Sequence, residues 1–91
     1  GKYGRMRHAY MKDHRPALYS TLLLTEKLFS HLAEIDAACK NRLEIIEAEM
    51  MCREGVTEAL KAADQMGWVR RRNSIHSRAE EIVLHELVYA E

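Results

Sequence analysis

Apolar side chains recur at helical spacing along most of the chain, and the clearest stripe lies between residues 28 and 50. Its members are separated by four or three residues over about six turns, with acidic residues on either side. This spacing predicts a helix from about Ser30 to Glu54, ended by Gly55 because glycine suits the position just after a helix. The stripe consists of Leu28, Leu32, Ile35, Cys39, Leu43, Ile46 and Met50.

A second long apolar arc follows Thr57, whose hydroxyl can cap a new helix. From Glu58 to about Tyr89 the sequence contains no proline, and Gly67 costs a helix only about 1 kcal/mol. The pattern therefore predicts one continuous helix, with Trp68 opening its apolar arc and largely buried beside the small Gly67. The other members of this arc, which is about 100° wide, are Ile75, Ala79, Ile82 and Val83.

Two shorter helices are predicted before the long pair. Apolar positions recur at helical spacing from Tyr3 to His14, which indicates a short basic amphipathic helix. Pro16 suits the first turn of the next helix, since its missing N–H would have no partner there, and that helix loosens around residues 25–30. The chain contains no alternating run of β-branched residues, so no strand is predicted. We therefore expect one all-α domain over residues 1–91, an antiparallel helical bundle with two short N-terminal helices, two long helices and no sheet.

The two long helices are longer than the hydrophobic core that such a short chain can form. A domain of this size buries only about 60–65% of its unfolded surface, whereas helices of about 25 and 32 residues span about 37 and 48 Å. An antiparallel homodimer would bury the apolar helix surface that the rest of the chain cannot cover. The residues expected to form the core or the dimer interface are Leu32, Ile35, Leu43, Ile46, Met50, Trp68, Ile75 and Ile82.

The formal charges cancel overall but are segregated along the chain. Fourteen Lys and Arg oppose fourteen Asp and Glu, and they fall into four blocks of alternating sign. Residues 1–20 and 68–78 each carry +4, and residues 21–67 and 79–91 each carry −4. Such blocks create local fields even where the total is zero. They predict either charge pairing within the chain or a dimer, or basic surfaces that bind a polyanion.

The stretch "WVRRRNSIHSR", residues 68–78, holds four arginines and no acid. Arg72 falls inside the apolar arc, so its stem lies along that arc or its guanidinium pairs with an acid across an interface. The other three arginines and Ser74 share a separate arc, where they can contact phosphates or simply face solvent and acidic residues. The candidate nucleic-acid-binding residues are Arg70, Arg71, Ser74 and Arg78, together with Lys2, Arg5, Lys12 and Arg15 of the first basic block.

The stretch "MCREGVTEALKAADQ" resembles the turn of a helix-turn-helix motif, in which glycine turns the chain and valine packs beneath it. Its second helix would present Glu58, Lys61, Asp64 and Gln65 to the DNA, and phosphates would repel the acids in that set. Any tight helical hairpin carries the same signals.

No catalytic motif is present: the chain lacks a glycine-rich phosphate loop, a nucleophile elbow and an H-E-x-x-H helix. No two histidines are four residues apart, and Cys39 and Cys52 have the character of structural thiols. We therefore expect no catalytic residues, no metal, no cofactor and no small-molecule substrate. The absence of a secretory signal and of an apolar run of about 20 residues predicts a cytoplasmic protein without a membrane segment.

Nearly the whole chain resembles the TnpV family, small proteins encoded within bacterial transposons and integrative elements. The resemblance rests on "YGRMRHAYMKDHRPALYSTLLLTEKL", "HLAEID", "REGVTEALKAADQMGWVRRRNSI" and "RAEEIVLHELVY", which span about residues 3–89. Family members usually have further residues before the position of Gly1. They usually carry Met at position 72, Glu at position 67 and Arg at position 76, where this chain has Arg72, Gly67 and His76.

The resemblance implies a genetic context rather than a chemistry. The family has no established activity and no agreed catalytic residues, so it assigns none here, and it implies an excisionase-like or recombination-accessory role. We therefore expect a non-enzymatic, homodimeric accessory protein of a mobile element that acts on element DNA or on a recombinase complex. The alternative is a helical protein-interaction and oligomerisation module that contacts no nucleic acid.

Overall fold

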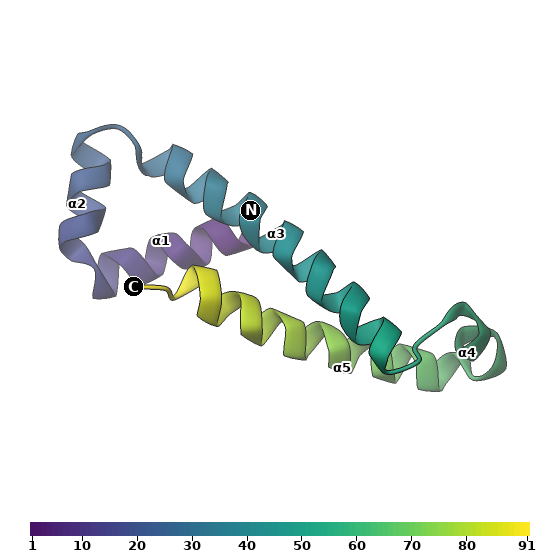
Figure 1. Cartoon of the computed structure of the whole chain (residues 1–91). Coiled ribbons are helices and arrows are strands. Elements are labelled where there is room, and N and C mark those ends of the chain that lie inside the picture. Colours follow the sequence, from purple (N-terminus) through teal and green to yellow (C-terminus); the bar gives the residue numbers. More distant parts are fainter.

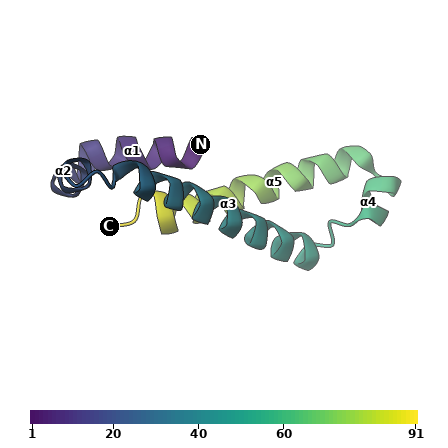
Figure 2. The ribbon, with the colours of Figure 1, turned by 90° about the horizontal axis from the view of Figure 1, so that it is seen from above.

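The computed structural model describes all 91 residues. It contains helices and no strand, which confirms the all-α prediction. The molecule is elongated, measuring 55 × 19 × 18 Å (Figures 1 and 2). Its elements are α1 (Lys2–His14), α2 (Pro16–Leu24), α3 (Leu28–Arg53), α4 (Glu58–Ala63), α5 (Gln65–Val83) and a π-helical segment (Leu84–Val88).

Helix α3 is the longest element, and α4 is the only helix that does not pack against it. Helix α5 returns antiparallel beside its second half, and α1 lies along its first half (Figure 1). The core follows this seam because the apolar stripe of α3 meets the apolar arc of α5. Its buried members are Tyr3, Cys39, Ile46, Met50, Val56, Ile75, Ala79, Val83 and Val88.

The apolar stripe that was expected to form a core or a dimer interface packs within the chain. Of the eight residues expected to form the core or the dimer interface, Ile46, Met50 and Ile75 are buried. Leu32 is half-buried and lines a groove between α1 and α3. The remaining predicted members are half-buried against the same core, namely Ile35, Leu43, Trp68 and Ile82.

The chain turns between α3 and α4 much as the sequence indicates. Gly55 follows α3 with a φ of 67°, a left-handed conformation that glycine adopts at no steric cost. Val56 is buried beneath the turn. The Thr57 hydroxyl then accepts a hydrogen bond of 3.2 Å from the Leu60 N–H and caps α4.

The predicted continuous helix from Glu58 to Tyr89 is wrong, because the chain breaks at Asp64. This residue leaves the helical conformation (φ −148°, ψ 81°), and its carboxylate accepts a 3.0 Å hydrogen bond from the Gly67 N–H. A capped helix therefore restarts at Gln65. A Cβ at position 67 would collide with the Asp64 carboxylate, so glycine at this position makes room for the cap.

The break at Asp64 also overturns two further expectations. Helix α4 packs on α5 and not on α3, so the helix-turn-helix interpretation is wrong. Trp68 lies in the first turn of α5 near the end of the molecule and is half-buried rather than largely buried. Trp68 packs against the core, and Lys61 Nζ lies 4.7 Å from the centroid of its ring.

Helix α1 approaches α3 closely at Gly4. A Cβ at this position would lie 3.2 Å from the Leu32 carbonyl oxygen, so a larger residue would separate the two helices. Asp36 of α3 uses this proximity to cap α1, because its Oδ1 accepts hydrogen bonds from the N–H groups of Tyr3 (3.1 Å) and Gly4 (3.2 Å). Hydrogen bonding to Lys40 and to Gly4 lowers the pKa of Asp36.

Helix α2 has no charged residue and no buried residue. It begins at Pro16, as predicted, and closes one end of the molecule between α1 and α3 (Figure 1). Its last two residues, Leu23 and Leu24, are 50% and 82% exposed, and Phe29 at the start of α3 is 80% exposed. The end of this apolar helix is therefore uncovered, while its residues Leu18, Tyr19 and Leu22 are half-buried.

The core position Ile75 supports a direct test of this packing. We expect Ile75→Ala to lower the free energy of unfolding by about 2–5 kcal/mol, since Ile75 is fully buried and alanine leaves a cavity. Urea unfolding followed by circular dichroism measures the loss. Ile45→Ala is the matched control, because Ile45 is 43% exposed and should lose less than about 0.5 kcal/mol. Equal losses in the two variants would contradict the arrangement of α3 and α5.

Candidate functional site: the charged surfaces and the groove between α1 and α3

The basic block of residues 68–78 folds against the acidic block that contains α3. Arg72 Nη1 donates a 2.9 Å hydrogen bond to Glu47 Oε1, and His76 Nδ1 lies 2.8 Å from the same oxygen. His76 Nε2 also lies 3.7 Å from Glu80 Oε2. Arg72 thus pairs with an acid across the α3–α5 interface, and that acid belongs to the same chain. Arg72 and His76, two of the three residues that depart from the family pattern, therefore both contact Glu47.

Glu47 is largely buried, and its surroundings shift the pKa of its carboxyl group in two opposite directions. Burial by itself raises the pKa of Glu47, but hydrogen bonds and charge from Arg72 and His76 outweigh it, so the pKa is lowered overall. The carboxylate therefore stays charged and bound to α5. The sequence hides this role, because Glu47 resembles the solvent-facing acids around it.

Two members of the predicted nucleic-acid-binding arc are engaged within the molecule. Arg78 makes a two-pronged contact with Glu54, from Nη1 to Oε2 at 2.7 Å and from Nη2 to Oε1 at 2.8 Å. This contact lowers the pKa of Glu54 and raises that of Arg78. Arg78 Nε also lies 3.3 Å from both the carbonyl oxygen and the Oγ of Ser74. The Arg78–Ser74 pair therefore faces Glu54 rather than an open surface.

The first basic block pairs with the last acidic block in the same way. Lys2 Nζ and the Tyr3 hydroxyl donate to Glu80 Oε2 at 2.9 and 2.8 Å, and Arg15 Nη1 lies 3.8 Å from Glu91 Oε2. The Lys2 and Tyr3 hydrogen bonds lower the pKa of Glu80. Both +4 blocks are thus partly neutralised by acids that lie far away in the sequence.

Arg7 is a buried cation that the sequence interpretation missed. Its Nη1 donates to the carbonyl oxygens of Val88 (3.0 Å) and Ala90 (2.7 Å), which would otherwise lack partners at the end of the π-helical segment. Burial lowers the pKa of its guanidinium. The signal was its spacing, because Arg7 lies four residues from each of the buried residues Tyr3 and Met11.

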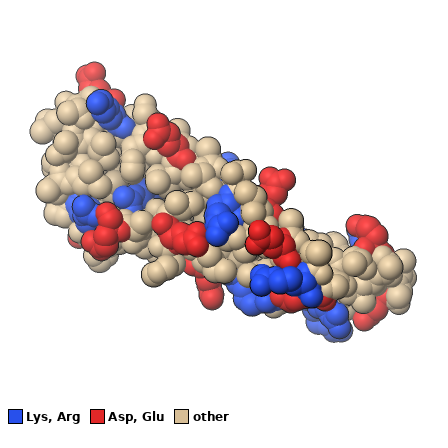
Figure 3. Space-filling model, viewed as in Figure 1, with Lys and Arg blue, Asp and Glu red and all other residues tan.

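Four of the eight candidate nucleic-acid-binding residues form no ion pair and are exposed. Figure 3 shows basic residues gathered over the ends of α3 and α5 nearest α4, with acidic residues beside them. The structure does not bring the eight together on one surface, because two of the free cations lie on α1 and two on α5. The four free residues are Arg5, Lys12, Arg70 and Arg71.

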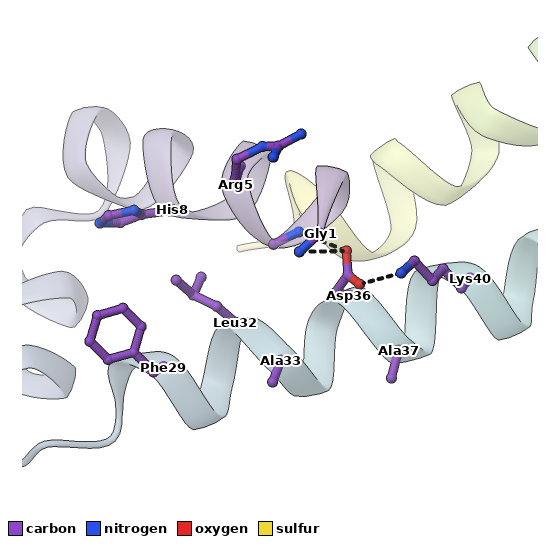
Figure 4. Close-up of a pocket in the computed structure, with 10 residues that line it drawn as sticks. Gly1, Arg5, His8, Phe29, Leu32, Ala33, Asp36, Ala37 and Lys40 are labelled. Carbon is purple, nitrogen blue, oxygen red and sulfur yellow. Dashed lines mark hydrogen bonds and ion pairs between the residues drawn. The ribbon is translucent and has the colours of Figure 1, made fainter.

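A groove with a volume of about 520 Å³ runs between α1 and α3. Phe29, Leu32 and Ala33 line its α3 side, and Arg5 and His8 lie on its α1 side (Figure 4). His8 Nε2 is buried without a hydrogen-bond partner. At one end Asp36 and Lys40 pair with each other at 2.9 Å, so neither offers a free charge.

The remaining chemistry-bearing side chains do not assemble into a recognisable centre. No group of three or more His, Cys, Asp or Glu side chains is placed to hold a metal ion. Cys39 is buried, which raises the pKa of its thiol, and Cys52 is exposed. None of the helices combines the length and the apolar content needed to cross a membrane.

A family model described as transposon-encoded protein TnpV matches residues 1–88. The chain belongs to the TnpV family. No curated protein and no solved structure matches it. The TnpV fold seen here is therefore an elongated all-α arrangement in which charge blocks of opposite sign meet across the helix interfaces.

The Glu47 contact makes stability depend on pH in a defined direction. Its folded-state pKa lies below the ordinary value of 4.5, so its stabilising contribution is complete above that value. The contribution is lost as the pH falls through the lowered folded-state pKa. We expect Glu47→Gln to lower the free energy of unfolding by about 1–3 kcal/mol near neutral pH, and to make the acid-side loss below about pH 5 shallower than in the parent.

Urea unfolding at a series of pH values measures both effects of Glu47→Gln. Glu44→Gln is the matched control, because Glu44 is exposed and forms no ion pair, and it should keep the pH profile of the parent. A Glu47→Gln profile parallel to that of the parent would show that Glu47 is not held by Arg72 and His76.

Proposed function

We propose that this TnpV-family protein is a non-enzymatic accessory protein of its transposon and that it works through protein–protein contact. The observation that carries this proposal is the uncovered apolar surface formed by Leu23, Leu24 and Phe29. Exposed apolar clusters of this kind mark protein-interaction sites in soluble proteins. We call these three side chains the α2 corner.

The charge distribution supports the same proposal. Lys2, Arg15, Arg72 and Arg78 each contact an acid of the same chain, so less positive charge remains for a polyanion than the sequence blocks suggest. Binding to phosphates depends on cations that are not already paired with acids of the protein. Leu23, Leu24 and Phe29, by contrast, are at least half exposed, so their apolar surface remains available to a partner.

A genetic assay tests whether the α2 corner matters to the transposon. We expect the combined variant Leu23→Ser, Leu24→Ser, Phe29→Ser to reduce the excision or transposition frequency of the element to the level seen when the gene is deleted. Helicity should be unchanged, because the three side chains are at least half exposed. Met66→Ser is the matched control, since Met66 is 69% exposed and lies at the far end of the molecule on α5. Full function of the triple variant would refute the proposal.

A second candidate function is direct contact with element DNA, including an excisionase-like supporting role in recombination. The observation in its favour is that Arg70 and Arg71 are exposed cations without an ion pair. Two such arginines contact phosphates without reading bases, so they provide weak binding that is independent of sequence.

A gel-shift titration tests this second candidate. Binding through two phosphates should weaken with salt along a log–log slope of about −2, and Arg70→Glu with Arg71→Glu should abolish it. Lys12→Glu is the control, because it reverses an exposed, unpaired charge on α1, far from Arg70 and Arg71. If the parent does not retain element DNA even at about 50 mM salt, direct DNA binding is excluded as the role of these arginines.

A further inference from the structure

The chain exposes more surface than a compact monomer of its mass. Its accessible surface is 6140 Å², whereas a folded monomer of this size exposes about 5,500 Å². The radius of gyration is 16.8 Å, against about 12 Å for a compact domain of this length. The excess area, about 650 Å², approaches the share of about 800 Å² that each partner buries in a standard interface.

Exposed apolar side chains are concentrated where α2 meets α3. Leu24 and Phe29, the two most exposed large apolar side chains of the molecule, flank the turn between these helices. Figure 4 shows that Phe29 and Leu32 point into the groove between α1 and α3. Phe29 therefore belongs both to the α2 corner and to the groove, and it joins the projecting helix end to the hollow.

The two parts of this surface are complementary in charge. Arg5 stands on the rim of the groove and has no ion pair within the chain. Glu26 follows the two terminal leucines of α2, is exposed and also has no ion pair. A projecting apolar helix end with an adjacent anion thus matches an apolar hollow with an adjacent cation.

We propose that the occupant of this surface is a second copy of the chain, with the α2 corner of each protomer seated in the α1–α3 groove of the other. Such a contact is isologous: it places Leu24 on Phe29 and Leu32 of the partner protomer and pairs Glu26 with the partner protomer's Arg5, twice per dimer. This inference rests on the proposed function, namely that the protein works through protein–protein contact. A lipid surface fits less well, because α2 has none of the Lys and Arg residues by which interfacial helices bind anionic lipid.

Sedimentation equilibrium of the full chain tests this assembly. The buffer must contain a reducing agent, because the exposed Cys52 can link two chains by a disulfide. At tens of micromolar the parent should have twice the chain mass of 10.6 kDa. Leu24→Lys and Phe29→Lys should each raise the dimer dissociation constant about a hundredfold or more, since every substitution acts twice in the dimer. Met66→Lys, on an equally exposed side chain elsewhere, should leave the dimer intact.

A charge exchange identifies the occupant. Arg5→Glu and Glu26→Arg should each weaken the dimer about tenfold, and the double variant should recover the affinity of the parent. This recovery occurs only if Arg5 of one copy meets Glu26 of another. A parent that is monomeric, a dimer insensitive to Leu24→Lys and Phe29→Lys, or a double variant that stays weak would each overturn the proposal. So would a monomer that co-sediments with vesicles of anionic phospholipid.

The outcomes also separate this inference from the proposed function. If the parent is monomeric but the serine variant of the α2 corner fails in the genetic assay, the surface serves another protein and self-association is wrong. If the dimer dissociates as expected but the serine variant supports normal transposition, self-association stands and the proposed function is wrong.

Discussion

The burial of one apolar stripe on α3 is the constraint from which the rest of the structure follows. A helix of 26 residues cannot be covered by any single partner in so short a chain, so different elements cover different lengths of it. Helix α5 covers the second half, while α1 and the π-helical segment cover the first. The molecule is consequently long and thin rather than round. Its ends, where α2 and α4 lie, have the least cover (Figure 1).

Charge pairing complements this apolar seam by selecting one alignment of the helices along it. An apolar stripe alone tolerates a shift by one helical turn, whereas Glu47 meets Arg72 and His76 only in the observed alignment. Arg78 pairs with Glu54 in the same alignment. The segregated blocks of charge thus act mainly inside the molecule. Five of the nine Lys and Arg residues in the two basic segments are accordingly engaged within the chain.

Local signals in the sequence were sufficient for most helix boundaries. Pro16, Gly55 and Thr57 act through their own backbone preferences or side chains, and each stands where the sequence placed it. The break at Asp64 was not predictable in this way. Asp64 lies within a run of good helix formers, and its capping role depends on the space that Gly67 leaves three residues later.

The candidate site was less predictable than the fold, because its properties depend on contacts between distant residues. Arg72 was recognised as misplaced on an apolar arc, but its partner Glu47 lies 25 residues away and looks like its solvated neighbours. From the sequence alone, Arg78 looks like an exposed cation without a partner. Its partner Glu54 is found only in the structure, where the end of α3 packs beside α5. The exposure of α2 was hidden for the opposite reason, since a run of leucines normally indicates burial.

The contacts of Arg7 have a consequence for how the chain acquires its structure during synthesis. This guanidinium is buried only when the carbonyl groups of Val88 and Ala90 are in place, more than 80 residues later. Helix α1 therefore leaves the ribosome long before its final neighbours exist, and it can dock completely only once those residues have followed. Folding of this helical protein thus includes a contact of very long sequence separation, which slows the closing step relative to bundles built from local hairpins. Until that step, α1 and α2 remain accessible to chaperones and to other nascent chains.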